Sequence, residues 1–403
     1  MTNFNIDSFI SQHITKRNKS FFEVDIKNNF HILSNEIENS AVLVIGGAGT
    51  IGSNYIKSIL QFKPAKVVVV DTSENGLTEL VRSVRSTPGL YVPAEFITYP
   101  VSLGDKIFKK IYDYYKPFDI IANFAAHKHV RSEKDIFSVE AMIENNVFNA
   151  SRLLQLIEED HPSHFFCVST DKAANPVNIM GATKKLMEEV VIEYAASINC
   201  TTARFANVAF SNGSLLDGFI NRMMYKQPLS IPGDVKRYFV SPAESGEICM
   251  LASVLGTPGD IFFPKLKEDE LTSFYDITDR FITQSGYTME VCSTDAEAKE
   301  KSLLIDKTKK YPVYVSDSNT TGEKLYEEFY TETESVDWER FESLAVAKTL
   351  EQNIPGNKLE AIKELRELFR EPGISKSNVV DILSRHIATF EHIEKGISLD
   401  RKM

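Results

Sequence analysis

The sequence predicts an α/β fold: a Rossmann-like, doubly wound parallel sheet with a smaller C-terminal lobe and extra helices at both ends. Three observations predict it. Short apolar runs alternate with amphipathic stretches between residues 41 and 208. A glycine-rich turn follows the first of these runs, at 46–52. After residue 210 the strand-like runs become shorter while Gly, Pro and Ser become more frequent, which favours a separate lobe.

Strands that are buried on both faces of a parallel sheet form continuous apolar runs, such as AVLVIG at 41–46. Residues 53–62 follow the glycine turn and place Ile56, Ile59 and Leu60 on one side of a helix. Further strands are predicted at 66–71, 95–101, 118–126, 164–170 and 200–208. Further helices are predicted at 105–116, 136–159, 344–350, 357–371 and 377–396, with one or two short ones within 1–38.

Composition excludes several classes of function. The 403 residues are 43% hydrophobic and carry a net charge of −11, so no basic surface for nucleic acid or an anionic membrane is expected. The four cysteines lie far apart without a CxxC pair, which argues against a disulfide framework or a zinc site, and we predict no metal. No apolar run has the length of a signal peptide core or a membrane span. We therefore expect a cytoplasmic protein.

The glycine-rich turn has the features of a dinucleotide site. Gly46, Gly49 and Gly52 lie between a predicted strand and a predicted helix, where a sharp turn lets the backbone approach a pyrophosphate at the helix N-terminus. Asp71 ends the next strand, nineteen residues beyond Gly52. A carboxylate there accepts from the adenosine ribose hydroxyls and repels a 2′-phosphate, which favours NAD over NADP. The alternative is a glycine-rich turn in an ordinary sheet protein.

The segment VSTDKAANPVNIMGATKK at 168–185 carries the candidate chemistry. Short-chain dehydrogenase-type enzymes place a Tyr four residues before a Lys here, but Met180 precedes Lys184 and has no proton to exchange. Asp171 and Lys172 lie at the end of a strand, where open α/β sheets bind ligands. The carboxyl could protonate a leaving hydroxyl, and the amine could remove a carbon-bound proton. The alternative is a surface ion pair with a helix-capping Asp.

The chain resembles the nucleotide-sugar 4,6-dehydratases of bacterial polysaccharide and glycan biosynthesis, extended short-chain dehydrogenase/reductase proteins that act on UDP-N-acetylglucosamine. Met in place of Tyr is similar to the large, membrane-anchored members that retain the configuration at carbon 5. The matching segments are FFEVDI at 21–26, VIGGAGTIGS at 44–53, VVVDTSENGL at 68–77, NFAAHKHV at 123–130, ENNVFN at 144–149, STDKAANPVNIMGATKKLME at 169–188, RFANVAFSNGSLLDGF at 204–219, KRYFVSP at 236–242 and TGEKLYEE at 321–328.

The resemblance implies an internal redox cycle in which NAD is not consumed and a 6-deoxy-4-keto sugar is formed. Lys172 would take the proton from carbon 5, and Asp171 would protonate the leaving hydroxyl of carbon 6. Thr170 would bind near the oxygen of carbon 4, and Lys184 would hold the nicotinamide ribose. The acceptor of the proton from the carbon 4 hydroxyl stays open: a water or Asp171 could serve.

The resemblance also implies the binding residues. Cofactor contacts are expected from Gly46, Gly49, Thr50, Ile51, Gly52, Asp71, Ser73, Glu74, Ala125, Ala126 and Lys184. Substrate contacts are expected from Lys128, His129, Asn207, Asn212, Gly213, Ser214, Arg237 and Glu323. His129 could instead satisfy only the backbone of its own loop. Related proteins form homodimers or higher homo-oligomers, which is the expected assembly here.

These observations predict four parts: a helical N-terminal extension at 1–38, an NAD-binding Rossmann domain at 39–210, a nucleotide-sugar-binding lobe at 211–335 and a C-terminal helical extension at 336–403. Two other functions stay open. An epimerase or 4-keto reductase would share the fold but would need no acid for carbon 6, so Asp171 beside Lys172 argues against it. A non-catalytic module that binds NAD or a nucleotide-sugar would explain Met180.

Overall fold

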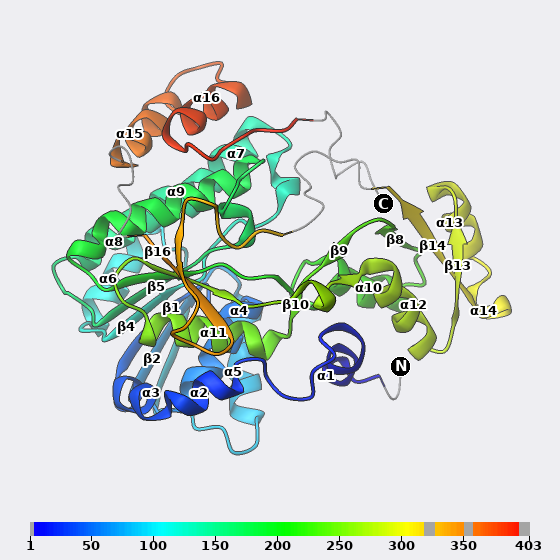
Figure 1. Cartoon of the computed structure of the whole chain (residues 1–403), viewed down its shortest axis with the longest axis horizontal. Helices are drawn as coiled ribbons and strands as arrows, with labels where there is room; N and C mark the ends of the chain where they lie inside the picture. The colour runs from blue at the N-terminus through cyan, green and yellow to red at the C-terminus, as the bar shows by residue number, and fades with distance from the viewer. Residues whose placement is uncertain (1–3, 318–326, 350–357, 395–403) are drawn as a thin grey trace.

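The computed structural model describes residues 4–317, 327–349 and 358–394. A nine-stranded sheet forms the centre of its larger part, in the order β15-β16-β11-β6-β5-β4-β1-β2-β3 (Figure 1). The strands are β1 (Ala41–Ile45), β2 (Lys66–Asp71), β3 (Glu95–Pro100), β4 (Ile120–Asn123), β5 (His164–Val168), β6 (Cys200–Ala203), β11 (Asp260–Pro264), β15 (Ser335–Asp337) and β16 (Leu344–Lys348). From β11 to β3 the strands pair in parallel, whereas β16 and β15 pair antiparallel. The predicted doubly wound α/β fold is confirmed.

Helices cover both faces of this sheet. On one face lie α3 (Phe30–Ile37), α4 (Thr50–Leu60), α5 (Glu74–Ser86) and α11 (Pro242–Leu255). On the other lie α6 (Lys106–Tyr115), α7 (Ile136–Ile143), α8 (Asn149–Ile157) and α9 (Ile179–Glu193). The helix predicted at 136–159 is interrupted by one π-helical segment, η3 (Glu144–Phe148), between α7 and α8. Each helix therefore buries one apolar face against strands that are apolar on both sides.

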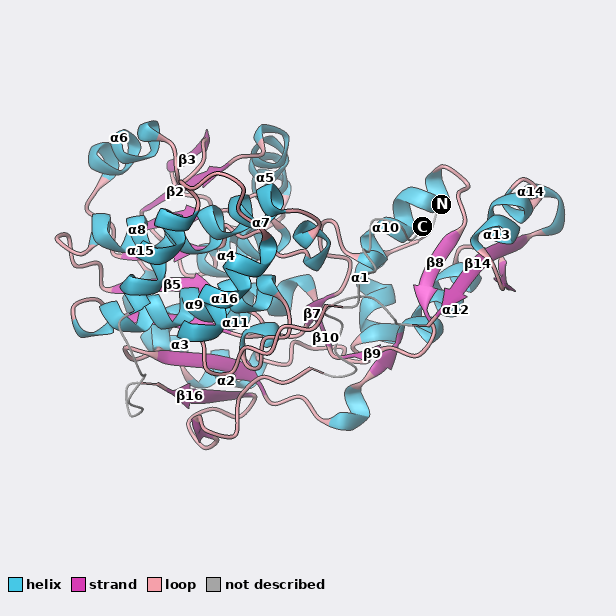
Figure 2. Ribbon diagram, turned by 90° about the horizontal axis from the view of Figure 1, so that it is seen from above, coloured by secondary structure: helices cyan, strands magenta, loops and turns pink. Residues whose placement is uncertain are grey.

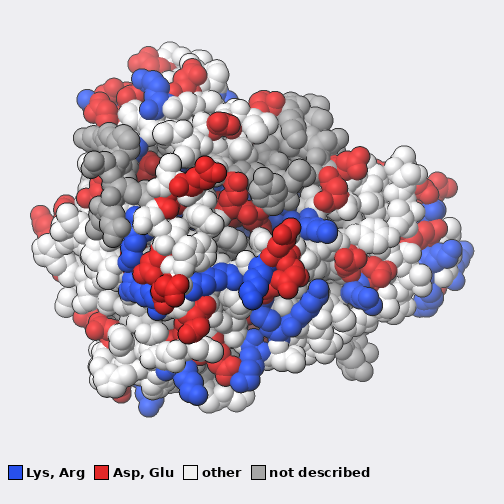
Figure 3. All heavy atoms as spheres, viewed as in Figure 1, with Lys and Arg blue, Asp and Glu red and all other residues white. Residues whose placement is uncertain are grey.

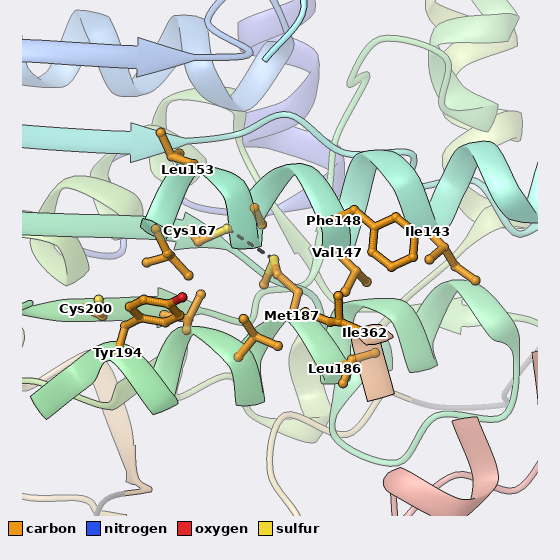
Figure 4. Close-up of a cluster of buried hydrophobic side chains, with 14 of the residues drawn as sticks. Ile143, Val147, Phe148, Leu153, Cys167, Leu186, Met187, Tyr194, Cys200 and Ile362 are labelled. Atoms are coloured by element: carbon orange, nitrogen blue, oxygen red, sulfur yellow. Dashed lines mark hydrogen bonds between the residues drawn. The ribbon is translucent and has the colours of Figure 1, made fainter. Parts of the chain in front are cut away.

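The C-terminal helices α15 (Lys358–Leu368) and α16 (Lys376–His386) lie over α9, on the side away from the sheet (Figure 1). Figure 4 shows part of the hydrophobic core on this side of the sheet, in which Ile362 of α15 lies close to Leu186 of α9. Cys167 in β5 contacts Met187 of α9 through its thiol, at 3.1 Å between the sulfurs. All four cysteines are buried and unpaired, which fits the prediction that they form no disulfide framework.

A second, smaller sheet lies in a lobe beside the large one (Figure 2). We call residues 215–232 and 274–316 the small lobe; its three strands β8 (Leu229–Pro232), β14 (Lys310–Ser316) and β13 (Thr288–Cys292) pair in parallel in the order β13-β14-β8. Its helices are α10 (Leu215–Met224), α12 (Phe274–Gln284), α13 (Asp295–Ser302) and α14 (Ile305–Thr308). Four short strands lie between the two parts: β7 (Asn207–Val208) pairs with β10 (Phe239–Val240), and β9 (Lys236–Arg237) pairs with β12 (Thr272–Ser273).

The N-terminal extension contacts both parts. Its helical segments are α1 (Ile6–Phe9), a π-helical turn at Ile10–Ile14, α2 (Glu23–Asn28) and α3, which is more than the one or two short helices predicted. Phe9 and Ile14 are buried in the core of the small lobe, whereas Phe22 is buried against the large sheet layer. Arg17, between them, forms ion pairs with Glu244 (3.0 Å) and Glu270 (2.9 Å). The extension therefore links the two parts.

Two expectations about the C-terminal part were wrong. The helix predicted at 344–350 is the strand β16, and its residue 350 lies outside the described residues. The run Leu-Ala-Val-Ala suits either state, and pairing with β11 through five residues decides for the strand. The helix predicted at 377–396 ends at His386, and residues 387–394 are non-helical.

The large sheet also takes elements from later in the chain. The strand β11 and the helix α11 come from the range 211–335 predicted for the lobe, yet they lie in the large sheet and against α4. Their apolar residues complete a face of the sheet that the earlier strands leave open. The division of the chain into domains at the predicted boundaries stays a prediction.

The surface carries charges of both signs. On the face shown in Figure 3, acidic and basic side chains are interspersed. Within the described residues, no helix has the length and apolar character needed to cross a membrane.

Candidate functional site

The glycine turn leaves β1 and enters α4, at the point where the strand order reverses between β1 and β4. Gly46 has a φ of +75°, and a Cβ there would lie 2.6 Å from the backbone nitrogen of Ala125. A Cβ on Gly52 would lie 2.4 Å from the oxygen of Gly46. A Cβ on Gly49, in contrast, would meet nothing closer than 3.5 Å, so the turn is open at this residue. This cradle fits a pyrophosphate at the N-terminus of α4.

Asp71, at the end of β2, lies against the same turn. Its carboxylate accepts the backbone N–H of Ala48 and that of Ser73, both at 2.9 Å. Ser73 in turn caps α5, which begins at Glu74. An acid held in this position at the neighbouring strand end fits the ribose of a dinucleotide.

Two adjoining cavities lie beyond these strand ends, with volumes of about 420 Å³ and about 670 Å³. The smaller cavity is lined by the glycine turn together with Thr50, Ile51 and Ala126. The larger one extends over α10 and β8 of the small lobe. The residues common to both are Lys128, His129, Asp171, Lys172, Asn207, Gly213, Ser214, Leu215 and Phe274. Asp171 and Lys172 are thus among the residues at the junction of the two cavities.

The acid and the base predicted from the sequence form a close pair in the short 3₁₀ helix η4 (Asp171–Ala173), which follows β5. The Nζ of Lys172 lies 3.0 Å from each carboxylate oxygen of Asp171. The hydroxyl of Thr170 donates to Asp171 Oδ1 at 2.7 Å. The side chain of Asp171 is 7% exposed and that of Lys172 33% exposed. The pair is thus partly shielded from water but reaches both cavities.

Met180 and Lys184 line the smaller cavity from α9. Met180 is buried, and its backbone N–H donates to Glu133 at 2.8 Å. The Nζ of Lys184 donates to the backbone oxygen of Val168 at 2.8 Å. Burial lowers the pKa of Lys184. Both residues thus lie on one face of α9, as their spacing on a helix requires, and line the same cavity as Thr170.

Lys128 and His129 extend from the loop after β4 into both cavities. Burial lowers the pKa of Lys128, although the charge of Asp217 opposes this effect. Burial also lowers the pKa of His129, and the charges of Lys128 and Arg131 lower it further. A Cβ on Gly213, whose φ is +73°, would lie 3.2 Å from His129 Nε2. The absence of a side chain at Gly213 therefore leaves room for this imidazole.

Of the other predicted substrate residues, some line the cavities and some do not. Asn207 and Ser214 line both cavities, and Arg237 lines the larger one. Asn212 is exposed, and its backbone N–H donates to Thr50 Oγ1 at 2.9 Å. Glu323 lies outside the described residues.

Four charged residues of the larger cavity were not predicted: Arg131, Asp217, Arg222 and Glu327. Arg131 lies two residues after His129, a spacing that could have indicated it. Arg222 lies two helical turns beyond Ser214, on α10. Glu327 lies in the segment 321–328 that was matched to the resembled family, but only the fold shows which acid of this segment faces the cavity.

A family model described as polysaccharide biosynthesis protein matches residues 42–349. The capsular polysaccharide biosynthesis protein CapD of Staphylococcus aureus is 27% identical over 82% of this chain and 53% of its own length. The probable polysaccharide biosynthesis protein EpsC of Bacillus subtilis is 26% identical over 80% of this chain and 50% of its own length. The chain thus spans about half the length of these two relatives.

Solved structures show the same fold. The X-ray structure of Pen from Bacillus thuringiensis has a TM-score of 0.62 at 20% identity and covers 82% of this chain and 98% of Pen. DesIV, a dTDP-glucose 4,6-dehydratase from Streptomyces venezuelae solved with NAD and TYD bound, has a TM-score of 0.54 at 20% identity. It covers 87% of this chain and 96% of DesIV.

Proposed function

The chain belongs to the polysaccharide biosynthesis protein family, and from that premise we propose that it is an NAD-dependent nucleotide-sugar 4,6-dehydratase. The preferred substrate is UDP-N-acetylglucosamine, and the product is the 6-deoxy-4-keto sugar with its configuration at carbon 5 retained. The observation that carries the proposal is the Asp171–Lys172 pair at the junction of the two cavities. An acid and a base side by side are what the loss of water from neighbouring carbons requires.

The smaller cavity is the proposed NAD site. The glycine turn would hold the pyrophosphate, and Asp71 the adenosine ribose. Lys184, Met180 and Thr170 line the same cavity, and the nicotinamide would lie beside them. When bound, NAD would accept a hydride from carbon 4 of the sugar and return it to carbon 6. The solved structure of DesIV supports this choice of cofactor, since NAD is bound in it.

The larger cavity is the proposed nucleotide-sugar site. Its basic side chains, Lys128, Arg131, Arg222 and Arg237, suit a diphosphate in a protein whose net charge is −11. The sugar would then lie at the junction of the cavities, with its carbons 4, 5 and 6 near Thr170, Asp171 and Lys172. This orientation directs the reacting carbons toward the NAD site.

The chemistry of the pair follows from its short distance. Transfer of one proton from the Lys172 ammonium to the Asp171 carboxylate, across 3.0 Å, produces a neutral amine and a carboxylic acid together. The amine then takes the proton from carbon 5, and the acid gives its proton to the hydroxyl that leaves carbon 6 as water. The charged ion pair is thereby restored. As hydride is delivered to carbon 6, the Lys172 ammonium would return its proton to carbon 5, and the neutral amine would regain a proton from water. The proton released from the carbon 4 hydroxyl would pass to water, so that no net proton is gained or lost. The hydroxyl of Thr170 donates to Asp171 and so holds the carboxyl in this orientation.

The test is incubation with UDP-N-acetylglucosamine, followed by mass analysis and NMR of the product. We expect a product that is lighter by one water, with the configuration at carbon 5 of the substrate. Lys172→Ala is expected to reduce turnover by ~10²–10⁴-fold, the usual contribution of a general base. Unchanged substrate across UDP-, GDP- and CDP-sugars would reject the dehydratase, and full activity of Lys172→Ala would reject the assigned base.

A further inference from the structure

Glu327 is a buried carboxyl that has no role in the scheme above. Its side chain is 3% exposed, and it lines the larger cavity together with Asp171, Lys172, Asn207 and Arg237. Burial and the charge of Asp171 raise the pKa of Glu327 to about 8, although Lys172 and Arg237 oppose this rise. Burying a carboxyl beside a second carboxyl costs free energy, which the hydrogen bonds of Glu327 must offset.

Both oxygens of Glu327 accept N–H groups, one from β7 and one from the residue between β9 and β10. Oε1 accepts the side-chain amide of Asn207, which begins β7, and Oε2 accepts the backbone N–H of Tyr238 at 2.9 Å. The backbones of Asn207 and Tyr238 are also joined, by a hydrogen bond of 3.2 Å. Arg237 Nε lies 3.9 Å from Oε1. Glu327 therefore holds the side chain of Asn207 against the strand that carries Arg237.

These contacts determine the direction of the Asn207 amide. A primary amide has two N–H donors on one atom and its acceptor on another. When Glu327 is ionised, both of its oxygens accept, so the Asn207 nitrogen faces Glu327 and the carbonyl oxygen of Asn207 is the acceptor left for a ligand. Asn207 lines both cavities, so this oxygen would lie at their junction. The matching ligand group there is a hydrogen-bond donor.

We propose that Glu327 is a positioning residue that fixes the Asn207 amide with its oxygen toward the junction, where it accepts a hydroxyl or amide N–H of the sugar. This inference rests on the proposed function, since the sugar is placed at the junction only by that proposal. Asn207 would thus bind the sugar itself, whereas the basic residues of the larger cavity would bind the diphosphate.

The segment that carries Glu327 is itself anchored. Arg204 at the end of β6 donates to the backbone oxygen of Phe329 at 3.0 Å and to both carboxylate oxygens of Glu334 at 2.8 Å. Arg204 is fully buried, so this anchor is shielded from water. An acceptor that is held in place before the ligand binds loses little entropy on binding, which favours affinity and specificity.

The test is Glu327→Gln, measured at about pH 9, where a carboxyl with a pKa of about 8 is ionised. Gln has one acceptor atom, which Tyr238 N–H requires, so its NH₂ group faces Asn207 and forces that amide to turn its own NH₂ to the junction. We expect KM for UDP-N-acetylglucosamine to rise ~10-fold or more, because the NH₂ group of Asn207 then faces the donor group of the sugar and their hydrogen bond is lost. The Ki of UDP, which lacks the sugar, should change less than about twofold. Glu332→Gln, the same substitution at an exposed residue nearby, should change neither.

A double-mutant cycle with Asn207→Ala separates positioning from a general structural role. If Glu327 acts through Asn207, Glu327→Gln has almost no further effect on KM in the Asn207→Ala background. Equal weakening of UDP and the nucleotide-sugar, or an unchanged cost without Asn207, would overturn the inference.

Failure of the proposed function gives a different result. If the wild type binds a UDP-, GDP- or CDP-sugar without turnover, the same cycle is measured as Kd by calorimetry, with the matching nucleoside diphosphate as the sugar-free control. The dehydratase would then be rejected while the role of Asn207 is still decided. If no nucleotide-sugar binds more tightly than its bare diphosphate, the inference is overturned.

Discussion

Substitution of Arg204 tests whether the buried ion network holds the site together. Arg204 is fully buried, and all five of its N–H groups are used. Nε and Nη2 donate to Glu188 at 2.8 and 2.7 Å, Nη1 and Nη2 to Glu334 at 2.8 Å, and Nη1 also to Phe329. Burial by itself raises the pKa of Glu334, but Arg204 outweighs this and lowers it to about 2. The guanidinium is therefore the main counter-charge of two buried acids.

Arg204→Met removes this counter-charge but keeps an unbranched apolar side chain. Breaking a buried ion pair by removing one partner costs ~3–5 kcal/mol, because the remaining charge stays buried. Lys185 lies 3.5 Å from Glu334 and 3.8 Å from Glu188 and compensates in part, so we expect a loss near the lower end of this range. The measurement is urea-induced unfolding followed by far-UV circular dichroism.

Two further variants control this experiment. Glu188→Gln and Glu334→Gln, added to Arg204→Met, remove the uncompensated charges and should restore a large part of the lost stability. Lys226→Met breaks an exposed pair with Asp306 and should leave the unfolding midpoint unchanged. A loss below ~1 kcal/mol for Arg204→Met, or no recovery in the triple variant, would refute the reasoning.

Three other predictions each concern one residue. Gly52→Ala places a Cβ 2.4 Å from the backbone oxygen of Gly46, so NAD affinity should fall ~10-fold or more by calorimetry. Gly89→Ala, with no neighbour within 4 Å, strains its own backbone at a φ of +75° but should keep the NAD affinity. Burial raises the pKa of Glu247 to about 7. The unfolded chain therefore loses this proton first, and stability falls as pH rises from ~4.5 to 7, by up to ~1.4 kcal/mol per unit; Glu247→Gln should remove that slope in urea unfolding at several pH values. Burial raises the pKa of Cys167 to about 11, so iodoacetamide should label it at pH 8 only after unfolding; rapid labelling of the folded protein would contradict its burial.

The central fold could be predicted from the sequence because its strands are apolar on both faces. Runs such as residues 41–46 and 66–71 have no polar alternation, as expected of strands that are covered on both faces of a parallel sheet. The strand β16 could not be predicted, because the hydrophobicity of its five residues has neither a helical nor a strand period. Its partner β11 also lies some eighty residues earlier in the chain.

The proximity of some candidate site residues could also be predicted, whereas their roles stay predictions. Asp171, Lys172, Met180 and Lys184 are close in sequence, and a strand followed by a helix brings them together. Glu327 and Arg204 could not be found in this way. Glu327 reaches Asn207 from 120 residues further along the chain, and neither of two consecutive acids, Glu327 and Glu328, is distinguished by its neighbours. Only the fold shows that the first of them faces the cavity.

The most direct test of the proposed chemistry is turnover of UDP-N-acetylglucosamine in D₂O. The side chain of Lys172 is 33% exposed, so its ammonium exchanges with solvent while it holds the proton from carbon 5. We predict a product that has lost water and carries one deuterium, at carbon 5, by mass spectrometry and NMR. An isomer of unchanged mass without deuterium would identify an epimerase, and a dehydrated product without deuterium at carbon 5 would contradict the role of Lys172.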